Sequence, residues 1–289
     1  AITDILEPGS TFKPLIVAAA LDSGRFSPSS RIDTNPGFVR VGNKTIEDKH
    51  NYGVMDPATI LAKSSNVGAV QIAMKLDKEM LWNTLSRFGA GRLTSSGYPG
   101  ESAGMLPPFQ GWRPIGQATM AYGYGLSMTP LQLAQAYAVL AGDGLSRPIS
   151  LVRVDKPSIA RRVVGPETAR NVVAMLETVV TSEGTGIKAN VTGYRVAGKT
   201  GTARKVAAGG YAQDRHTAVF AGLVPATAPR LVIVVVVDEP KGGVYYGGDV
   251  AAPVFSAVAA GALRILAVPP DAADPVADKP LTKLASSSP

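Results

Sequence analysis

The chain of 289 residues carries a formal net charge of +7, is 45% hydrophobic and contains no cysteine. This length is enough for one large domain or two small ones, and the apolar content is enough for a sizeable core. The lack of cysteine excludes disulfides and thiolate metal sites. The basic residues are scattered, without a Lys/Arg run or interleaved aromatic residues. We therefore expect a solvated basic surface and no nucleic-acid partner.

The first predicted element is a helix over residues 10–23, where apolar side chains recur on one face before Gly24 ends the pattern. Pro14 is compatible with this helix because it falls in the first turn. Residues 25–56 look irregular, and within them a hairpin is expected at 38–46.

A group of helices is expected next. Asp56, which precedes a proline, is typical of a helix start and predicts a helix over 57–63. Residues 64–66 then form the connection to a helix over 67–76, and a further helix covers 78–88.

The middle of the chain alternates between loop and helix. Residues 89–114 are dense in Gly, Pro and Ser and are predicted to be a long surface loop. A helix is expected from Thr129-Pro130 through Leu140. Another begins at Pro166, and its buried face reaches Val180.

Strands are expected late, as an antiparallel meander of residues 194–202, 216–224 and 230–238. The apolar run 231–237 does not alternate with polar residues, which predicts a strand covered on both faces. This run is also too short to span a bilayer.

The C-terminal region is predicted to hold a buried helix over 250–266, followed from Pro269 by a disordered tail. The segment 250–268 is long enough to cross a membrane, but Pro253 and Arg264 within it favour a buried helix. The first residues of the chain lack the charged and apolar regions of a signal peptide.

Three short motifs carry the candidate chemistry. Ser10 and Lys13 are three residues apart, which places both on one side of a helix, where a lysine can activate a serine nucleophile. Ser64-Ser65-Asn66 follows Lys63, and Lys199-Thr200-Gly201-Thr202 lies far downstream. Alone, the first could be a helix cap with a solvated lysine, the second a polar turn and the third a strand end with a glycine bulge. All three occur once, in an order typical of penicillin-binding proteins and class A β-lactamases.

The chain resembles the transpeptidase domain of high-molecular-weight penicillin-binding proteins from residue 5 to about residue 268. Asn66 and a Tyr-Gly-Tyr-Gly stretch make it most similar to the division-specific class B group. The resemblance is carried by residues 7–14, 63–68, 122–134, 198–203 and 245–248.

The resemblance implies a role for each residue of the first two motifs. Ser10 is then the nucleophile that attacks the carbonyl between the two terminal D-alanines of a peptidoglycan stem peptide, and Lys13 is its base. Lys13 must therefore be neutral part of the time, and burial beside a second cation, Lys199, lowers a lysine pKa. Ser64 would relay a proton toward the leaving amine, and Asn66 would orient Lys13 and hold a substrate amide.

The third motif is implied to bind the substrate. The backbone N–H groups of Ser10 and Thr202 would form the oxyanion hole. Lys199, Thr200 and Thr202 would bind the terminal carboxylate of the peptide, or the equivalent acid of a β-lactam. Gly201 lacks a side chain and would allow close approach of a ligand backbone.

Four aromatic or histidine side chains remain to be assigned. Tyr245 and Tyr246 either wall the pocket or are packed loop aromatics. His50 and His216 are expected to be structural, since nothing at metal-ligand spacing surrounds either. The resemblance implies no metal and no cofactor. Its implied partners are the stem peptide and β-lactam antibiotics.

The implied fold class is α/β of the α+β type, an antiparallel sheet flanked by helices together with an all-helical subdomain. Residues 1–268 would be the transpeptidase domain, and residues 269–289 a disordered tail. Family members carry a membrane anchor, a pedestal domain and the first strands of the sheet upstream of the Ser-x-x-Lys motif. These upstream parts, absent from this chain, would place the enzyme at the periplasmic face of the inner membrane and contact membrane proteins of the divisome.

Three alternatives stay open on the same scaffold. A serine β-lactamase would need a carboxylate or carbamylated lysine that activates water, and no Glu lies in a recognisable deacylation motif. A D,D-carboxypeptidase differs only in using water rather than an amine as acceptor. A non-catalytic penicillin sensor would be free to lose some of the motif residues, yet all of them are present.

Overall fold

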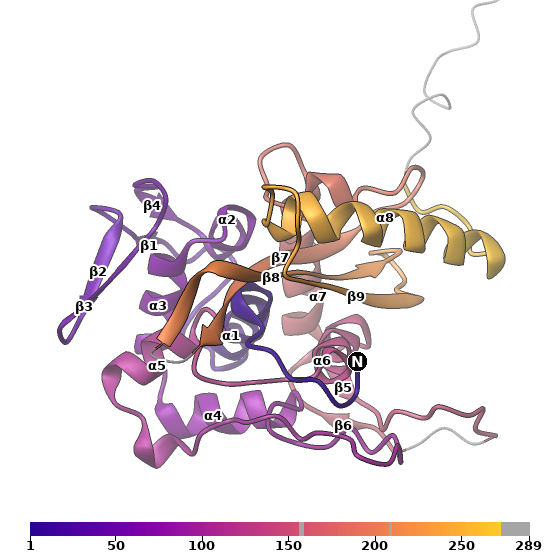
Figure 1. Cartoon of the computed structure of the whole chain (residues 1–289), viewed down its shortest axis with the longest axis horizontal. Helices are drawn as coiled ribbons and strands as arrows, with labels where there is room; N and C mark the ends of the chain where they lie inside the picture. The colour runs from indigo at the N-terminus through magenta and orange to yellow at the C-terminus, as the bar shows by residue number, and fades with distance from the viewer. Residues whose placement is uncertain (156–158, 208–209, 273–289) are drawn as a thin grey trace, which may run out of the picture.

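The computed structural model describes residues 1–155, 159–207 and 210–272 (Figure 1). Its centre is an antiparallel sheet in the order β7-β8-β9, formed by β7 (Ala197–Ala207), β8 (Gly210–Val224) and β9 (Leu231–Asp238). The predicted meander is therefore confirmed. Helix α8 (Gly247–Ile265) covers one face of the sheet, while α1 (Lys13–Asp22), α6 (Pro130–Ala141) and α7 (Pro166–Glu177) lie on the other (Figure 1).

The remaining elements form the helical part of the molecule and three small strand pairs. The predicted hairpin is confirmed as β2 and β3, which pair from Phe38↔Glu47 to Val41↔Lys44. The bounds are η1 (Gly9–Phe12), α1 (Lys13–Asp22), β1 (Ile32–Asp33), β2 (Phe38–Val41), β3 (Lys44–Glu47), β4 (Val54–Met55), α2 (Pro57–Lys63), α3 (Asn66–Met74), α4 (Lys78–Arg87), η2 (Phe109–Gly111), α5 (Pro114–Met120), α6 (Pro130–Ala141), β5 (Leu145–Ser146), β6 (Arg161–Arg162), α7 (Pro166–Glu177), η3 (Thr178–Val180) and η4 (Ile187–Ala189).

Helix starts follow the capping residues that the sequence shows. The Asp56 carboxylate accepts a 2.7 Å hydrogen bond from the Thr59 N–H at the start of α2. At the start of α6, Thr129 and Gln132 exchange side-chain and backbone hydrogen bonds in a capping box. Pro57 and Pro130 occupy the first helical positions, where the missing N–H has no cost.

Strand β9 packs on both faces, as the unbroken apolar run predicts. Val234 and Val236 pack against the large core around α1 and α6. Ile233 and Val235 pack against a second core beneath α8. Within the described residues no strand pairs with the second edge of β9. All residues from 231 to 237 accordingly stay half-buried rather than fully covered.

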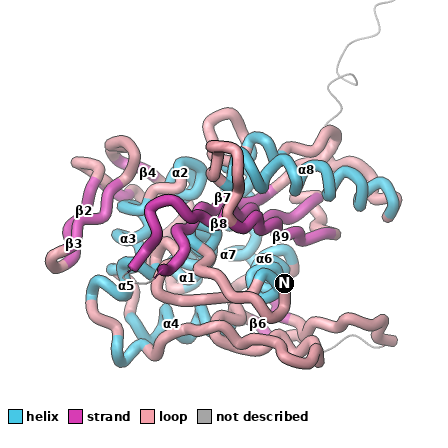
Figure 2. Tube along the Cα trace, viewed as in Figure 1, coloured by secondary structure: helices cyan, strands magenta, loops and turns pink. Residues whose placement is uncertain are grey.

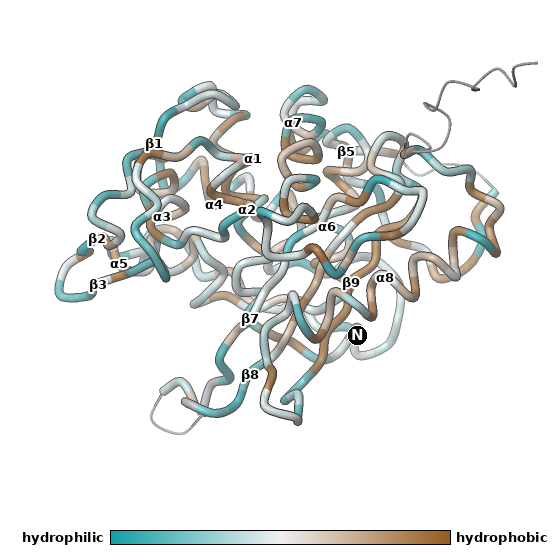
Figure 3. The backbone as a smooth tube through the Cα atoms, turned by 90° about the horizontal axis from the view of Figure 1, so that it is seen from above, coloured by the Kyte–Doolittle hydropathy of each residue, from teal (hydrophilic) through white to brown (hydrophobic). Residues whose placement is uncertain are grey.

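Several boundaries differ from the predictions. The chain begins its first helix with the 3-10 turn η1, and the α-helix starts only at Lys13. Asn66 is the first residue of α3 rather than part of the connection. Helix α5 was not anticipated. The strands β7 and β8 extend beyond β9 as a long two-stranded arm (Figures 2 and 3).

The last helix also begins earlier than expected, at Gly247 rather than residue 250. Two glycines at its start allow it to pass close to the sheet. A Cβ on Gly247 would lie 2.3 Å from the Gly201 carbonyl oxygen, and one on Gly248 would lie 2.2 Å from the Thr185 oxygen. Glycine is a poor helix former, but here only glycine fits.

Helix α8 is buried on one face only, which corrects the expectation of a buried helix. Phe255 and Leu263 are fully buried against the sheet, whereas Val258 is 49% and Ile265 82% exposed. Among the described helices, α8 alone is long and apolar enough to cross a membrane. The core helix of a soluble protein meets the same criterion, and α8 contacts all three strands.

The predicted disordered tail begins at residue 269, but Asp271 within it forms hydrogen bonds with the body of the protein. The Asp271 carboxylate accepts hydrogen bonds from the Arg195 N–H at 2.7 Å and from the Thr227 hydroxyl at 2.8 Å. Residues 273–289 of the predicted tail lie outside the described residues.

The contact between Gly9 and Gly123 joins the Ser10 turn to the Tyr-Gly-Tyr-Gly stretch and generates a stability prediction. Gly123 has φ +83, and its carbonyl accepts a 3.1 Å hydrogen bond from the Gly9 N–H. A Cβ there would lie 2.1 Å from the Gly9 oxygen. Gly125 has φ +76, but its nearest contact would be an ordinary 3.8 Å.

We expect Gly125→Ala to lose about 1–2 kcal/mol of unfolding free energy from the positive φ alone. Gly123→Ala should lose a further ~1–3 kcal/mol, since it adds a backbone clash. Urea unfolding of both variants measures the difference. Equal losses in the two variants would show that the Gly9 contact imposes no steric limit.

Candidate active site

The fold brings the three sequence motifs together between the helices and the edge of β7. Ser10 lies in η1 and Lys13 begins α1. A 3-10 turn eclipses positions i and i+3, so the two residues project on the same side. The Lys13 Nζ donates to the Ser64 carbonyl and hydroxyl, the latter at 3.3 Å, and to Asn66 Oδ1 at 2.7 Å. The first and second motifs are thus in direct contact.

The junction between α2 and α3 presents these acceptors. Ser64 ends α2 in the left-handed conformation, with φ 59 and ψ 36. Ser65 then caps α3, and its hydroxyl accepts a 2.8 Å hydrogen bond from the Gly68 N–H. The left-handed residue reverses the chain within one position. The carbonyl and hydroxyl of Ser64 and the amide of Asn66 can therefore all face Lys13.

Two lysines of the site are fully buried, Lys13 and Lys199. Burial holds the pKa of Lys13 well below its usual range, and the nearby Lys199 charge lowers it further, while Asp48 acts in the opposite direction. Burial alone lowers the pKa of Lys199 to about 7. Lys199 is thus the neighbouring cation that the sequence analysis anticipated.

Asp48 lies in the loop after β3 and contacts the start of α3. Its carboxylate accepts hydrogen bonds from the Asn66 N–H at 2.6 Å and from the Val67 N–H at 3.2 Å. It also accepts from the Ser65 hydroxyl. No local sequence pattern connects Asp48 with residues 65–67, so the sequence alone does not identify it as part of the site.

The edge of β7 carries the third motif. The Arg204 N–H points away from β8 and donates to the Tyr124 hydroxyl at 3.2 Å. Residues two apart in a strand direct their backbone groups to the same side, so the Thr202 N–H also points to this edge. The Thr202 hydroxyl accepts a 3.0 Å hydrogen bond from the Gly247 N–H. The hydroxyls of Thr200 and Thr185 lie 2.7 Å apart.

Gly201 proves to be needed for packing inside the protein. A Cβ at this position would lie 2.9 Å from Thr11 Cγ2 and 3.0 Å from the Pro8 carbonyl oxygen. The missing side chain therefore lets β7 approach the η1 turn that carries Ser10. This differs from the sequence interpretation, in which Gly201 left room for a ligand.

A cluster of aromatic side chains lies next to Thr202 and Arg204 of β7. His216 pairs with Arg204 across the β7–β8 ladder, and its ring stacks on Tyr245 with centroids 4.1 Å apart. Tyr245 lies 4.6 Å from the Tyr246 ring, and the Lys49 ammonium lies 4.2 Å from the Tyr246 centroid. His216, which the sequence predicts to be structural, thus belongs to the same cluster as the two tyrosines.

A cavity of about 400 Å³ opens at Ser10. Its described lining includes no carboxylate and consists of Ser10, Asn66, Thr119, Tyr122, Tyr124, Gly125, Thr202, Arg204 and Tyr211. Glu7 lies behind this wall. It accepts from the Gly125 N–H at 2.8 Å and from the Tyr211 hydroxyl at 3.0 Å, and burial raises its pKa.

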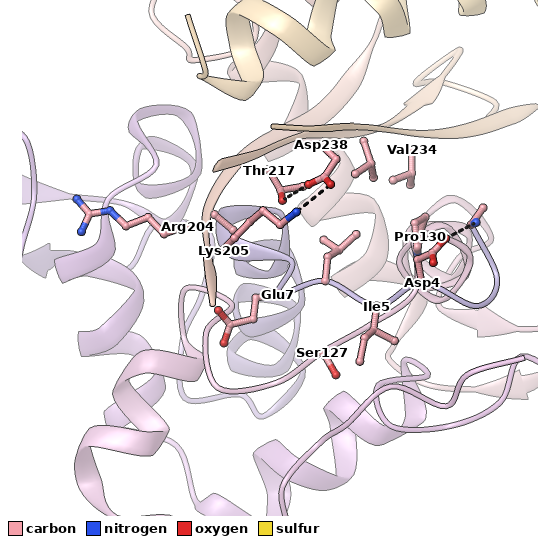
Figure 4. A pocket seen from close by; sticks show the side chains of 14 residues that line it. Asp4, Ile5, Glu7, Ser127, Pro130, Arg204, Lys205, Thr217, Val234 and Asp238 are labelled. Atoms are coloured by element: carbon pink, nitrogen blue, oxygen red, sulfur yellow. Dashed lines mark hydrogen bonds and ion pairs between the residues drawn. The ribbon is translucent and has the colours of Figure 1, made fainter. Parts of the chain in front are cut away.

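A second cavity of about 720 Å³ lies under the sheet (Figure 4). Ile5 and Pro130 line it on one side, and Thr217 and Val234 on the strand side. Its lining includes no residue of the three motifs, so size alone does not mark the site. Among the described residues no group of three His, Asp or Glu side chains could hold a metal ion.

Comparison with known proteins shows similarity over nearly the whole chain. The family model described as the penicillin binding protein transpeptidase domain matches residues 1–260. The chain is 44% identical over 271 residues to peptidoglycan D,D-transpeptidase FtsI of Escherichia coli K12, covering 94% of this chain and 46% of that protein. It is 40% identical over 289 residues to the probable peptidoglycan D,D-transpeptidase PenA of Neisseria gonorrhoeae, covering 100% of this chain and 48% of that protein.

A solved structure is similar as well. The apo transpeptidase domain of Burkholderia pseudomallei penicillin-binding protein 3 matches with a TM-score of 0.90 at 43% identity, covering 94% of this chain and 83% of that one. The chain spans about half the length of the curated relatives named above.

The low pKa of buried Lys199 predicts that the free energy of unfolding depends on pH. Its pKa is about 7 in the folded state and ~10.4 when unfolded. Between these values the unfolded state binds more protons, so stability rises with pH, by at most ~1.4 kcal/mol per pH unit for each such lysine. We expect urea unfolding at pH 7.5 and 9.0 to show a smaller rise for Lys199→Met than for the parent. Lys188→Met, at an exposed position, is the control. An unchanged rise in Lys199→Met would contradict the low pKa.

Proposed function

Because the chain belongs to the family of penicillin-binding protein transpeptidase domains, we propose that it is the catalytic part of a peptidoglycan D,D-transpeptidase that acts in septal wall synthesis. The observation that carries the proposal is the buried Lys13, hydrogen-bonded to Ser64 and Asn66 beside Ser10. Its substrate is the D-Ala-D-Ala end of a stem peptide. β-Lactams acylate the same serine.

Acylation begins with proton transfer from the Ser10 hydroxyl to Lys13. This requires neutral Lys13, which burial and the Lys199 charge favour. The Ser10 oxygen then attacks the carbonyl between the two D-alanines and forms a tetrahedral intermediate. The Ser64 hydroxyl, 3.3 Å from Lys13 Nζ, passes the proton to the amine of the leaving D-alanine. An amine of a second stem peptide later takes the acyl group from Ser10.

The edge of β7 binds the substrate in this proposal. The N–H groups of Thr202 and Ser10 stabilise the oxyanion, each worth several kcal/mol in such sites. Lys199 and the hydroxyls of Thr200 and Thr202 hold the terminal carboxylate. The backbone of Gly201 lies at the same edge. Support comes from the position of these groups on the edge of β7 that no described strand pairs with, next to the η1 turn.

Tyr245 and Tyr246 form one wall of the binding groove in this proposal. They precede Gly247, whose N–H donates to the Thr202 hydroxyl, so they stand next to the carboxylate-binding end. The rings of His216, Tyr245 and Tyr246 offer aromatic surface for the substrate side chain nearby.

The lining of the Ser10 cavity favours acyl transfer over β-lactamase activity. A β-lactamase needs a base that activates water on the acyl-enzyme. The described lining of the cavity holds no Asp or Glu. Asp48 is engaged by Ser65, Asn66 and Val67, and Glu7 by Gly125 and Tyr211. The acyl-enzyme is therefore expected to be long-lived when no amine acceptor is present.

We further propose that the domain comprises residues 1–268 and acts at the periplasmic face of the inner membrane, held there by upstream regions that also contact divisome proteins. The free edge of β9 supports the expectation that further strands complete the sheet. In native proteins, the edge of a sheet is normally paired with another strand, covered or otherwise protected.

Fluorescent penicillin tests the function directly. We expect covalent labelling of the parent at Ser10, located by peptide mass mapping, and no labelling of Ser10→Ala. The label should persist, and a supplied amine acceptor should release a cross-linked product from a peptide donor. Rapid loss of the label would indicate a β-lactamase, release by water alone a carboxypeptidase, and labelling without turnover a sensor.

The role of Lys13 is tested by Lys13→Arg beside Lys13→Ala. Arginine keeps its proton at every accessible pH and cannot act as the base. We expect both variants to slow acylation by at least about a hundredfold, the scale of general-base catalysis. Stopped-flow or mass-resolved acylation rates measure this. A rate for the Arg variant within a few-fold of the parent would mean that Lys13 acts only as a positioning charge.

A further inference from the structure

We propose that Asp48 is a positioning residue of the acylation site, which fixes the Ser64–Asn66 turn opposite Lys13 from a distant loop. The inference rests on the proposed function, because the turn is expected to serve proton transfer. It adds a residue that lies outside all three motifs.

Asp48 completes the start of α3 by accepting hydrogen bonds from its first N–H groups. The first N–H groups of a helix lack partners within the helix. One Asp48 oxygen accepts from the N–H groups of Asn66 and Val67, at 2.6 and 3.2 Å. The other accepts from the Ser65 hydroxyl, which itself accepts from the Gly68 N–H. The carboxylate thus accepts directly from two successive N–H groups and holds the Ser65 hydroxyl that accepts from a third, at the end of the helix where negative charge is favoured.

The residues held by Asp48 flank or form the Ser64–Asn66 turn. Asn66 donates its N–H to Asp48 and presents Oδ1 to Lys13 Nζ at 2.7 Å. Ser64, one residue before the capping Ser65, is left-handed with φ 59, a conformation that costs ~1 kcal/mol or more for a residue with a Cβ. Within the described residues, no group other than this carboxylate accepts a hydrogen bond from the Asn66 N–H. Without the carboxylate, the turn would be free to move relative to Lys13.

The charge of Asp48 also acts on Lys13. Two charged groups act on Lys13 among the described residues: Lys199 from β7 lowers its pKa, and Asp48 from the loop after β3 raises it. Tyr52, in the same loop, lies near Asp48 and near Lys63 of α2. Burial and the Asp48 charge raise the pKa of the Tyr52 hydroxyl, and the Lys63 charge lowers it. Removing the Asp48 charge should therefore favour neutral Lys13 at lower pH. A residue that only capped the helix would leave the Lys13 titration unchanged.

Two substitutions separate these effects in the full chain. Asp48→Asn keeps an oxygen for the two N–H groups and removes the charge. Asp48→Ala removes both. Asp56→Ala is the matched control, because Asp56 caps the neighbouring helix α2 through Thr59, and within the described residues its side chain forms no hydrogen bond with a motif residue. The measurement is the rate of Ser10 acylation by benzylpenicillin between pH 5 and 9, followed by mass spectrometry, with thermal unfolding recorded for each variant.

We expect Asp48→Ala to lower the plateau rate by about tenfold or more, since small misplacements of reacting groups have effects of that size. Asp56→Ala should stay within about twofold. Asp48→Asn should move the acidic limb of the profile to lower pH by about half a unit or more. An Asp48→Ala plateau within twofold of the parent, or an unmoved limb in Asp48→Asn, would overturn the proposal.

A readout that needs no activity keeps the inference separate from the proposed function. Amide hydrogen exchange at Asn66 and Val67 should be faster in Asp48→Asn than in the parent, and faster still in Asp48→Ala. The Lys13 ammonium should titrate at lower pH in Asp48→Asn by NMR. If the parent is not acylated at Ser10, the proposed function fails, and these two measurements alone decide the role of Asp48. Unchanged exchange and titration would reject it.

Discussion

The burial of Lys13 is the interaction on which the rest of the site depends. An ammonium group removed from water costs several kcal/mol unless it loses its proton or finds acceptors. Both conditions hold for Lys13. Its ammonium has three acceptors on Ser64 and Asn66, and burial and the Lys199 charge hold its pKa low. The junction of α2 and α3 and the edge of β7 must therefore both close over α1. Loss of either would leave Lys13 without acceptors or without the neighbouring charge.

Much of this arrangement could be predicted because its signals are local. Asp56 before Pro57 marks a helix start wherever it occurs, and the unbroken run 231–237 requires cover on two faces. The spacing of Ser10 and Lys13 forces them to one side of a turn, whether that turn is 3-10 or α. The family resemblance then predicts which motifs meet in the folded protein, which their spacing in the sequence does not.

The rest depends on contacts between residues distant in the chain. Asp48 reaches Asn66 across a loop, and Thr185 reaches the Thr200 hydroxyl from the segment after η3. Neither belongs to a recognisable local pattern. Gly201 illustrates a different limit: the sequence shows that a side chain is missing but not which neighbour, ligand or Thr11, occupies the space. Such assignments require the packed structure.

The hydrogen bond from the Arg204 N–H to the Tyr124 hydroxyl has a consequence for how a peptide can lie on β7. An extended chain that joins a sheet edge takes up every second backbone position in turn. Here the position after Thr202 is already occupied by the tyrosine. In the proposed binding mode, a peptide paired with β7 therefore finds the next N–H beyond Thr202 already engaged and leaves the sheet there. In that mode the strand edge holds the terminal residues of an extended chain, and the residues behind them make their contacts elsewhere.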